Sequence, residues 1–120
     1  MVLLYNLASD KDRKIKMIFL KMGIRMKVIT KEQYNQKIGY LADIKDFEKE
    51  ESSYEGTGFT EEMIVMRDFS NKRLDEMLYQ FRKAGIGKIN LKAVITESNQ
   101  DWTSLELYEE IRQEHEKMHQ

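Results

Sequence analysis

Cysteine and proline are absent from this chain of 120 residues, and only two of its residues are histidines. Without cysteine the chain has no disulfide framework, no thiolate metal ligand and no cysteine nucleophile. Its apolar runs are short, and none approaches the roughly 20 residues that span a bilayer. The apolar start at Val2–Tyr5 is too short for a signal peptide. We therefore expect a cytoplasmic protein with no membrane partner.

The common sequence signatures of enzymes are missing as well. The chain contains no glycine-rich phosphate loop, no His-Glu-x-x-His motif and no Gly-x-Ser-x-Gly motif. His115 and His119 are four residues apart, which suits a metal ion on a helix, but no third ligand is evident near this end of the chain. We expect no metal and no cofactor, and we favour a non-catalytic role over an enzyme, because no nucleophile is paired with a base.

The charge of the chain is unevenly distributed, although the net charge is only -1. Residues 1–45 carry ten Lys and Arg against four Asp and Glu, whereas residues 46–62 carry one against seven. Such asymmetry can mark an anionic partner for the basic part. The alternative is that the acidic segment lies near the basic surface and partly neutralises it. The sequence leaves both interpretations open.

Apolar periodicity predicts alternating strands and helices. Continuous or nearly continuous apolar runs, typical of strands covered on both faces, occur at Val2–Leu7 and Met63–Met66. Alternating patterns, typical of half-exposed strands, occur at residues 24–29 and 89–95. Each of the four expected helices begins at a residue suited to capping, namely Ser9, Thr30, Ser70 and Thr103.

The second half of the chain repeats the pattern of the first. At an offset of 62 residues, Phe19 aligns with Phe81, and Gly23 aligns with Gly85. Both glycines stand where a helix ends, a position that favours glycine. We interpret the match as an internal duplication of a β-α-β-α unit, since repeats of this kind constrain the fold.

The domain organisation follows from this duplication. We expect one compact domain with a first half at residues 1–45, an acidic flexible linker at residues 46–62, and a second half at residues 63–120. A mobile lid is the alternative for the acidic segment. The fold class is α/β, with a four-stranded sheet in the order 2-1-3-4, because continuous apolar strands belong at the centre and lysine-bearing ones at the edges. The pattern does not decide whether the two central strands are parallel.

The first helix is apolar around much of its circumference. Ile15, Phe19 and Met22 form one stripe at helical spacing, but Met17 and Leu20 lie off this stripe. A helix of this kind needs a second surface against which to bury these side chains. We favour a neighbouring helix of the same chain over a second copy of the chain.

Polar residues follow the two half-exposed strands, where α/β sheets tend to bind ligands. Free helix amides at such places favour anions. The alternative is that these side chains only cap helices and turns, which select the same residue types. The candidate ligand-binding residues are Lys31, Gln33, Lys92, Thr96, Asn99 and Trp102.

The same residues carry a family resemblance. The spacing of Lys92, Thr96, Asn99 and Trp102, with the flanking residues from about Glu62 to Met118, is similar to that of an uncharacterised bacterial domain of unknown function, DUF3783. The resemblance implies a small bacterial protein. It implies no assigned activity and supplies no catalytic residues.

The sequence favours two hypotheses for the function. The first is a binding, regulatory or protein-interaction module that forms a homodimer or docks a protein or a small anion, which the wide apolar first helix favours. The alternative is nucleic-acid binding through the basic first half, although the isoelectric point of about 6.2 and the lack of aromatic residues for stacking on the strands speak against it. Its candidate residues are Lys11, Arg13, Lys14, Lys21, Arg25 and Lys27.

Overall fold

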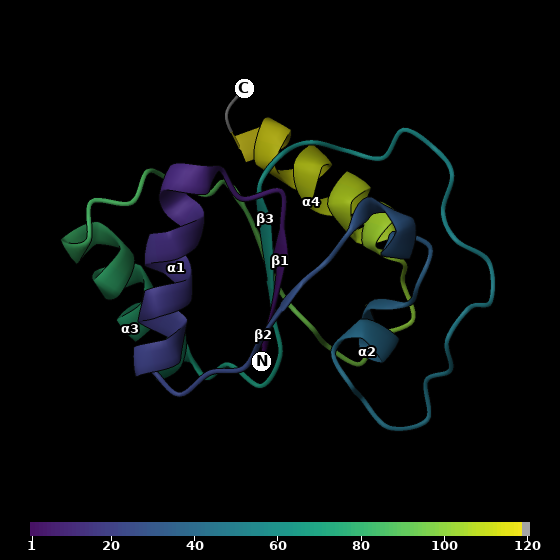
Figure 1. Ribbon diagram of the computed structural model, residues 1–120, viewed down its shortest axis with the longest axis horizontal. Coiled ribbons are helices and arrows are strands. Elements are labelled where there is room, and N and C mark those ends of the chain that lie inside the picture. Colours follow the sequence, from purple (N-terminus) through teal and green to yellow (C-terminus); the bar gives the residue numbers. More distant parts are fainter. Residues whose placement is uncertain (119–120) are drawn as a thin grey trace.

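The computed structural model describes residues 1–118, which form three layers (Figure 1). A four-stranded sheet lies in the middle, with α1 and α3 on one face and α2 and α4 on the other. The predicted α/β class and the strand order 2-1-3-4 are confirmed. Within residues 1–118, no helix combines the length and apolarity needed to cross a membrane. The elements in chain order are β1 (Val2–Tyr5), α1 (Ser9–Lys21), β2 (Met26–Val28), the 3₁₀ turn η1 (Lys31–Gln33), α2 (Ile38–Leu41), β3 (Met63–Met66), α3 (Asn71–Lys83), β4 (Leu91–Val94) and α4 (Ser104–Met118).

The direction of the central strands, which the sequence left open, is antiparallel. β1 pairs with β3 in the register Leu3 to Val65, whereas β1 with β2 and β3 with β4 are parallel pairs. The two halves of the chain therefore run in opposite directions across the sheet. As a consequence, the carboxyl ends of β2 and β4 point to opposite ends of the sheet as well as lying at opposite edges.

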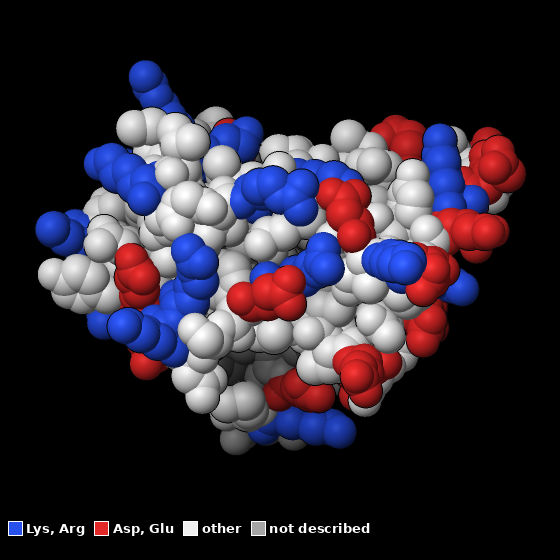
Figure 2. Space-filling model, turned by 90° about the horizontal axis from the view of Figure 1, so that it is seen from below, with Lys and Arg blue, Asp and Glu red and all other residues white. Residues whose placement is uncertain are grey.

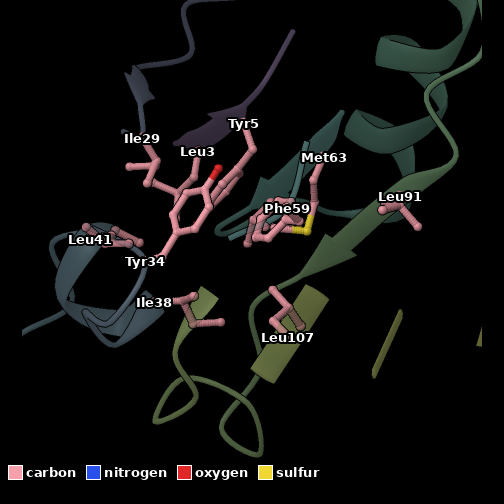
Figure 3. Packing of buried hydrophobic residues seen from close by; sticks show 12 residues of the cluster. Leu3, Tyr5, Ile29, Tyr34, Ile38, Leu41, Phe59, Met63, Leu91 and Leu107 are labelled. Carbon is pink, nitrogen blue, oxygen red and sulfur yellow. The ribbon is translucent and has the colours of Figure 1, made fainter. Parts of the chain in front are cut away.

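Alternation along the central strands divides the core into two clusters. Val2 and Leu4 of β1, with Ile64 and Met66 of β3, face α1 and α3. The intervening side chains face α2 and α4, where Figure 3 shows them converging with residues of both halves. Because both faces of β1 and β3 are covered, all their side chains are at most 2% exposed, which explains the continuous apolar runs.

The helix expected after Thr30 is interrupted. Thr30 and Gln33 form the predicted capping box, but only η1 follows it, and α2 starts afresh at Ile38. The backbone N–H groups of Ile38 and Gly39 donate to the carbonyls of Trp102 and Gln100, at 2.8 and 3.0 Å, instead of to residues one turn earlier. Backbone contacts between the two halves therefore override the helical periodicity of this stretch.

The capping residue of α1 also differs from the expectation. Ser9 is the first helical residue, and the N-cap is Ala8, whose side chain provides no cap. The amide of Ala8 is instead held at 2.9 Å by the carboxylate of Glu62. For α3 the prediction is confirmed, since the Ser70 hydroxyl accepts a hydrogen bond from the Arg73 amide at 3.1 Å.

These two helix starts give a matched pair of variants. We expect Ser70→Ala to lower the free energy of unfolding by about 1 kcal/mol, because the Arg73 amide loses its acceptor. Ser9→Ala removes no capping hydrogen bond and should change the free energy by less than about 0.5 kcal/mol. Urea unfolding of both variants measures the difference, and equal losses would contradict the placement of Ala8 as the N-cap.

The acidic segment 46–62 contains no helix or strand, yet contacts hold it to the body of the domain. The side-chain amide of Gln36 donates to the Glu50 carbonyl at 2.9 Å and accepts from the Glu50 amide at 2.8 Å. Phe59 is buried, with its ring stacked on Tyr34 at a centroid distance of 4.6 Å and on Tyr108 at 4.1 Å. The description of this segment as a flexible linker stays a prediction.

The contact between Tyr108 and this segment makes the stability of the fold depend on pH in the alkaline range. Its hydroxyl donates to a Glu61 carboxylate oxygen. Burial, followed by the hydrogen bond and charge of Glu61, raises the pKa of Tyr108 from 10 to about 12. The unfolded chain releases this proton at lower pH than the folded chain. The contribution to stability is therefore complete below pH 10 and is lost as the pH rises towards 12.

The Tyr108→Phe variant tests this contribution, because it keeps the stacked ring and removes the titrating group. We expect its free energy of unfolding to fall less steeply than that of the parent between pH 10 and pH 12, as measured by urea unfolding at closely spaced pH values. Parallel profiles for the two proteins would refute the assignment.

Candidate functional site

A groove runs between α1 and α3 on the outer side of the helical layer. It encloses about 490 Å³, a size within the usual range for binding pockets. The two helices come from different halves of the chain, and Arg73 of α3 ties them together by donating to the Met22 carbonyl at 2.8 Å. The residues that line the groove are Arg13, Lys14, Met17, Ile18 and Lys21 from the first half, and Gln80, Lys83 and Ala84 from the second.

The groove and the adjoining surface of α1 include apolar side chains that reach solvent. Met17, which lines the groove, is 49% exposed. Leu20, one turn further along α1 and outside the groove, is 66% exposed. The expectation that a neighbouring helix buries them is wrong. α3 packs beside the main stripe of α1, where Phe19 meets Phe81 edge to face at 5.9 Å, and it leaves the outer flank uncovered. α1 therefore presents an apolar surface with no occupant within residues 1–118.

Four cationic side chains surround this apolar surface, namely Arg13, Lys14, Lys21 and Lys83. Within residues 1–118, none of them takes part in an ion pair, and no acidic residue lines the groove. Figure 2 shows the consequence, since Lys and Arg predominate at the end formed by α1 and α3, and Asp and Glu at the opposite end. The groove is positively charged and apolar at once.

The structure divides the residues that the sequence assigned to nucleic-acid binding. Arg13, Lys14 and Lys21 gather in the groove. Lys11 instead pairs with Glu62 at 2.7 Å. Lys27 lies on the sheet face that α2 covers, and its amino group approaches Asp43 at 2.8 Å. Arg25 approaches the same carboxylate at 3.8 Å, and the two cations lower the pKa of Asp43. Only three of the six therefore lie on one surface without an acidic partner.

The predicted ligand-binding residues do not form one site. Because β2 and β4 are antiparallel edge strands, they end at opposite corners of the sheet, and Lys31 and Gln33 follow one end whereas Thr96 follows the other. The loop after β4 then returns to α2, where the Trp102 carbonyl accepts a hydrogen bond from the Ile38 amide. The side chain of Gln33 accepts a hydrogen bond from the Thr30 amide at 2.9 Å, as part of the capping box. Lys31 is exposed to solvent. The antiparallel pairing of the two halves therefore separates the end of β2 from the end of β4, the two places where the candidate ligand-binding residues were expected.

The loop after β4 contains Thr96, Asn99 and Trp102, and each of them has a structural partner. Thr96 and Asn99 hold each other by reciprocal side-chain and backbone bonds of 2.8 and 3.2 Å, and Asn99 also donates to the Val94 carbonyl at 3.2 Å. The indole of Trp102 packs against the core cluster. Lys92 lies apart from this loop, in a pocket beside α3. Ligand binding by the loop stays a prediction.

No metal centre is evident in residues 1–118, where no group of three or more His, Asp or Glu side chains is placed to hold an ion. His115 lies on α4, in a hollow that also contains Glu61 and Arg112. His119, its proposed partner, lies outside the described residues.

The comparisons with known proteins concern the second half of the chain. Residues 62–118 match the model of the family described as Domain of unknown function (DUF3783). The match runs from the residue before β3 through α4, so it includes α3 and leaves out α1. No match was found among curated proteins or among solved structures. The match supports the family resemblance for this half and brings no activity with it.

Sequence reasoning missed the groove because its two walls are distant along the chain. Met17 and Leu20 were recognised as lying off the main stripe, and the flanking Arg13, Lys14 and Lys21 were recognised as basic. The missing member was Lys83, which only the packing of α3 on α1 brings to the same place. An uncovered apolar flank bordered by basic residues was the available signal.

Proposed function

We propose that this protein is a non-catalytic interaction module whose α1–α3 groove docks an acidic, amphipathic segment of a partner protein. The observation that carries the proposal is the combination of exposed Met17 with four cations that have no acidic partner within residues 1–118. An amphipathic helix binds such a groove by placing apolar side chains, spaced three or four residues apart, on its floor. Carboxylates on the flanks of that helix would meet the cationic rim.

Charge selects this occupant over a second copy that uses the same face. In a two-fold dimer the same patch meets itself. Arg13, Lys14, Lys21 and Lys83 would then oppose their own equivalents, and juxtaposed like charges disfavour such a contact. A homodimer remains a proposal for a different face. A bacterial, cytoplasmic setting is part of the same proposal.

A synthetic helical peptide tests the docking function. The peptide carries leucines at positions i, i+4 and i+7 and glutamates on both flanks, and its binding is followed by fluorescence anisotropy. We expect saturable binding that weakens as salt is raised, because the rim cations are exposed. The control is a peptide with the same leucines and with lysine in place of every glutamate. Absence of binding by the acidic peptide, or equal binding of the two, would refute the proposal.

Nucleic-acid binding is the second candidate, because the same four cations would also attract phosphates. The Met17→Ser variant separates the two functions, since it removes an apolar contact and leaves every charge in place. If the occupant is an amphipathic helix, the variant weakens binding of the acidic peptide. If the groove serves nucleic acid, a duplex binds the parent and the variant equally, with affinity that falls steeply with salt.

A further inference from the structure

A second pocket lies on the other side of α3 from the groove, where that helix ends and the chain enters β4. It encloses about 350 Å³. Its apolar wall is formed by Leu78 and Phe81 of α3 and by Ile86 and Ile89 of the loop that follows. Neither the docking function nor the predicted ligand loop uses this pocket.

Three cations converge on this pocket, Arg82, Lys88 and Lys92, and no acidic side chain lines it. Within residues 1–118, none of the three forms an ion pair. Cationic groups around a partly apolar pocket with no internal counter-charge favour a small anionic ligand.

Lys92 differs from the other two cations because it is partly buried in the wall of the pocket. It stands on β4 opposite Ile64, so its side chain extends over the sheet face that α3 covers. Its amino group donates a hydrogen bond to the Ile89 carbonyl. Burial, and to a smaller extent the charge of Lys88, lowers the pKa of the Lys92 amine. Both conditions favour the neutral amine, which is the nucleophilic form of lysine.

Lysine on an edge strand also has a simpler role, which is to prevent unwanted strand pairing. Lys27 on β2, the opposite edge strand, shows how such a lysine is arranged. Its amino group is held by Asp43 and by the Leu41 carbonyl, both at 2.8 Å. Lys92 lacks a carboxylate partner within residues 1–118 and faces a pocket instead of a counter-ion. Protection of the edge does not account for this difference.

We propose that the pocket binds a small anionic carbonyl compound, such as a 2-oxo acid, whose carboxylate lies against Arg82 and Lys88 and whose carbonyl carbon reacts with Nζ of Lys92. In this reaction the lone pair of the neutral amine forms a C–N bond to the carbonyl carbon. The carbonyl oxygen then leaves as water with the two amine protons, and an imine remains. The reaction is reversible and needs no oxidant or reductant.

Reductive trapping tests the proposal on the intact chain. The protein is incubated at neutral pH with glyoxylate, the smallest 2-oxo acid, together with cyanoborohydride, which reduces the imine to a stable amine. Peptide mass spectrometry after several time intervals gives the rate at which each lysine is modified. We expect Lys92 to react severalfold faster than Lys27, the matched lysine of the other edge strand. Equal rates at the two lysines would overturn the proposal.

Two further comparisons keep the result specific. Propanal, which is neutral, replaces glyoxylate in the first, and we expect the advantage of Lys92 over Lys27 to shrink. An equal advantage with both aldehydes would overturn the assignment of an anionic ligand. The Arg82→Gln variant, in which the amine and Lys88 are retained, should lose part of the preference for glyoxylate. The Lys92→Arg variant should lose the fast-reacting site, and circular dichroism confirms that each variant is folded.

Discussion

Replacing Phe59 with alanine will lower the free energy of unfolding by roughly 3–5 kcal/mol. Phe59 is only 7% exposed, and its ring is nearly parallel to the rings of Tyr34 and Tyr108, with interplanar angles of 13° and 3°. Removing it leaves a cavity between the two halves of the chain, since Tyr34 follows η1 and Tyr108 lies on α4. A loss of this size is a large part of the total stability of a domain, which is typically about 5–15 kcal/mol. Urea unfolding followed by circular dichroism measures it.

The same substitution tests how the acidic segment 46–62 is held. Asn6 donates hydrogen bonds to the carbonyls of Phe59 and Glu61, at 3.0 and 3.1 Å, so the anchor lies at the end of the segment. Phe47→Ala is the control, because Phe47 is only partly buried at the other end of the segment. We expect a smaller loss there. Equal losses, or no increase in proteolytic cleavage of the segment in Phe59→Ala, would contradict the anchoring role.

Reversing two charges of the groove will weaken binding of the acidic peptide about fivefold or more. Lys14 and Lys83 line the groove from α1 and α3. An exposed ion pair contributes roughly 0.2–1 kcal/mol, and glutamate in place of each lysine adds a repulsion of similar size. The two substitutions together should therefore reduce the binding free energy by roughly 1–3 kcal/mol. Fluorescence anisotropy with the parent and the Lys14→Glu, Lys83→Glu variant gives the ratio of dissociation constants.

A matched variant controls for the change in net charge. Lys16 and Lys72 lie on the same two helices but do not line the groove, and Lys16 pairs with Asp12 at 3.0 Å. The Lys16→Glu, Lys72→Glu variant alters the net charge by the same amount. If this variant weakens binding of the acidic peptide as much as the groove variant does, the attraction arises from the net charge of the whole molecule and not from the groove.

The order of the strands could be predicted because burial of a strand on both faces requires a continuous run of apolar residues in the sequence. The runs at Val2–Leu7 and Met63–Met66 are apolar on both faces, so they belong at the centre, whereas Lys27 and Lys92 mark edges. The direction of the central pair requires no such pattern. A strand with both faces buried has the same pattern whether its neighbour is parallel or antiparallel.

The interrupted second helix could not be predicted for a different reason. The stretch after Thr30 has a capping box and apolar residues at helical spacing, and both signals are local. The amide of Gly39 instead bonds to Gln100, and a side chain at that glycine would meet the same carbonyl at 2.9 Å. This contact joins residues of the two halves, and only the folded arrangement of the halves creates it.

The candidate site shows the same difference, since local interactions could be predicted from the sequence and interactions between distant residues could not. Thr96 and Asn99 were singled out as binding or capping residues, and the structure shows the capping bonds that local chemistry favours. The antiparallel pairing of the halves places the end of β4, before Thr96, and the end of β2, before Lys31, at opposite corners of the sheet. No local pattern in the sequence indicates this separation. The groove depends on Lys83 of α3 and Met17 of α1 lining the same hollow, although they belong to different halves of the chain.

Nuclear magnetic resonance of the ¹⁵N-labelled protein, titrated with the acidic amphipathic peptide, tests most directly whether the α1–α3 groove is the binding surface. We expect the amide shifts to change progressively along Arg13–Lys21 and around Gln80–Ala84, and to remain unchanged in the loop at Thr96–Trp102. Shift changes confined to that loop, or to the edge strands β2 and β4, would contradict the assignment of the groove as the docking site.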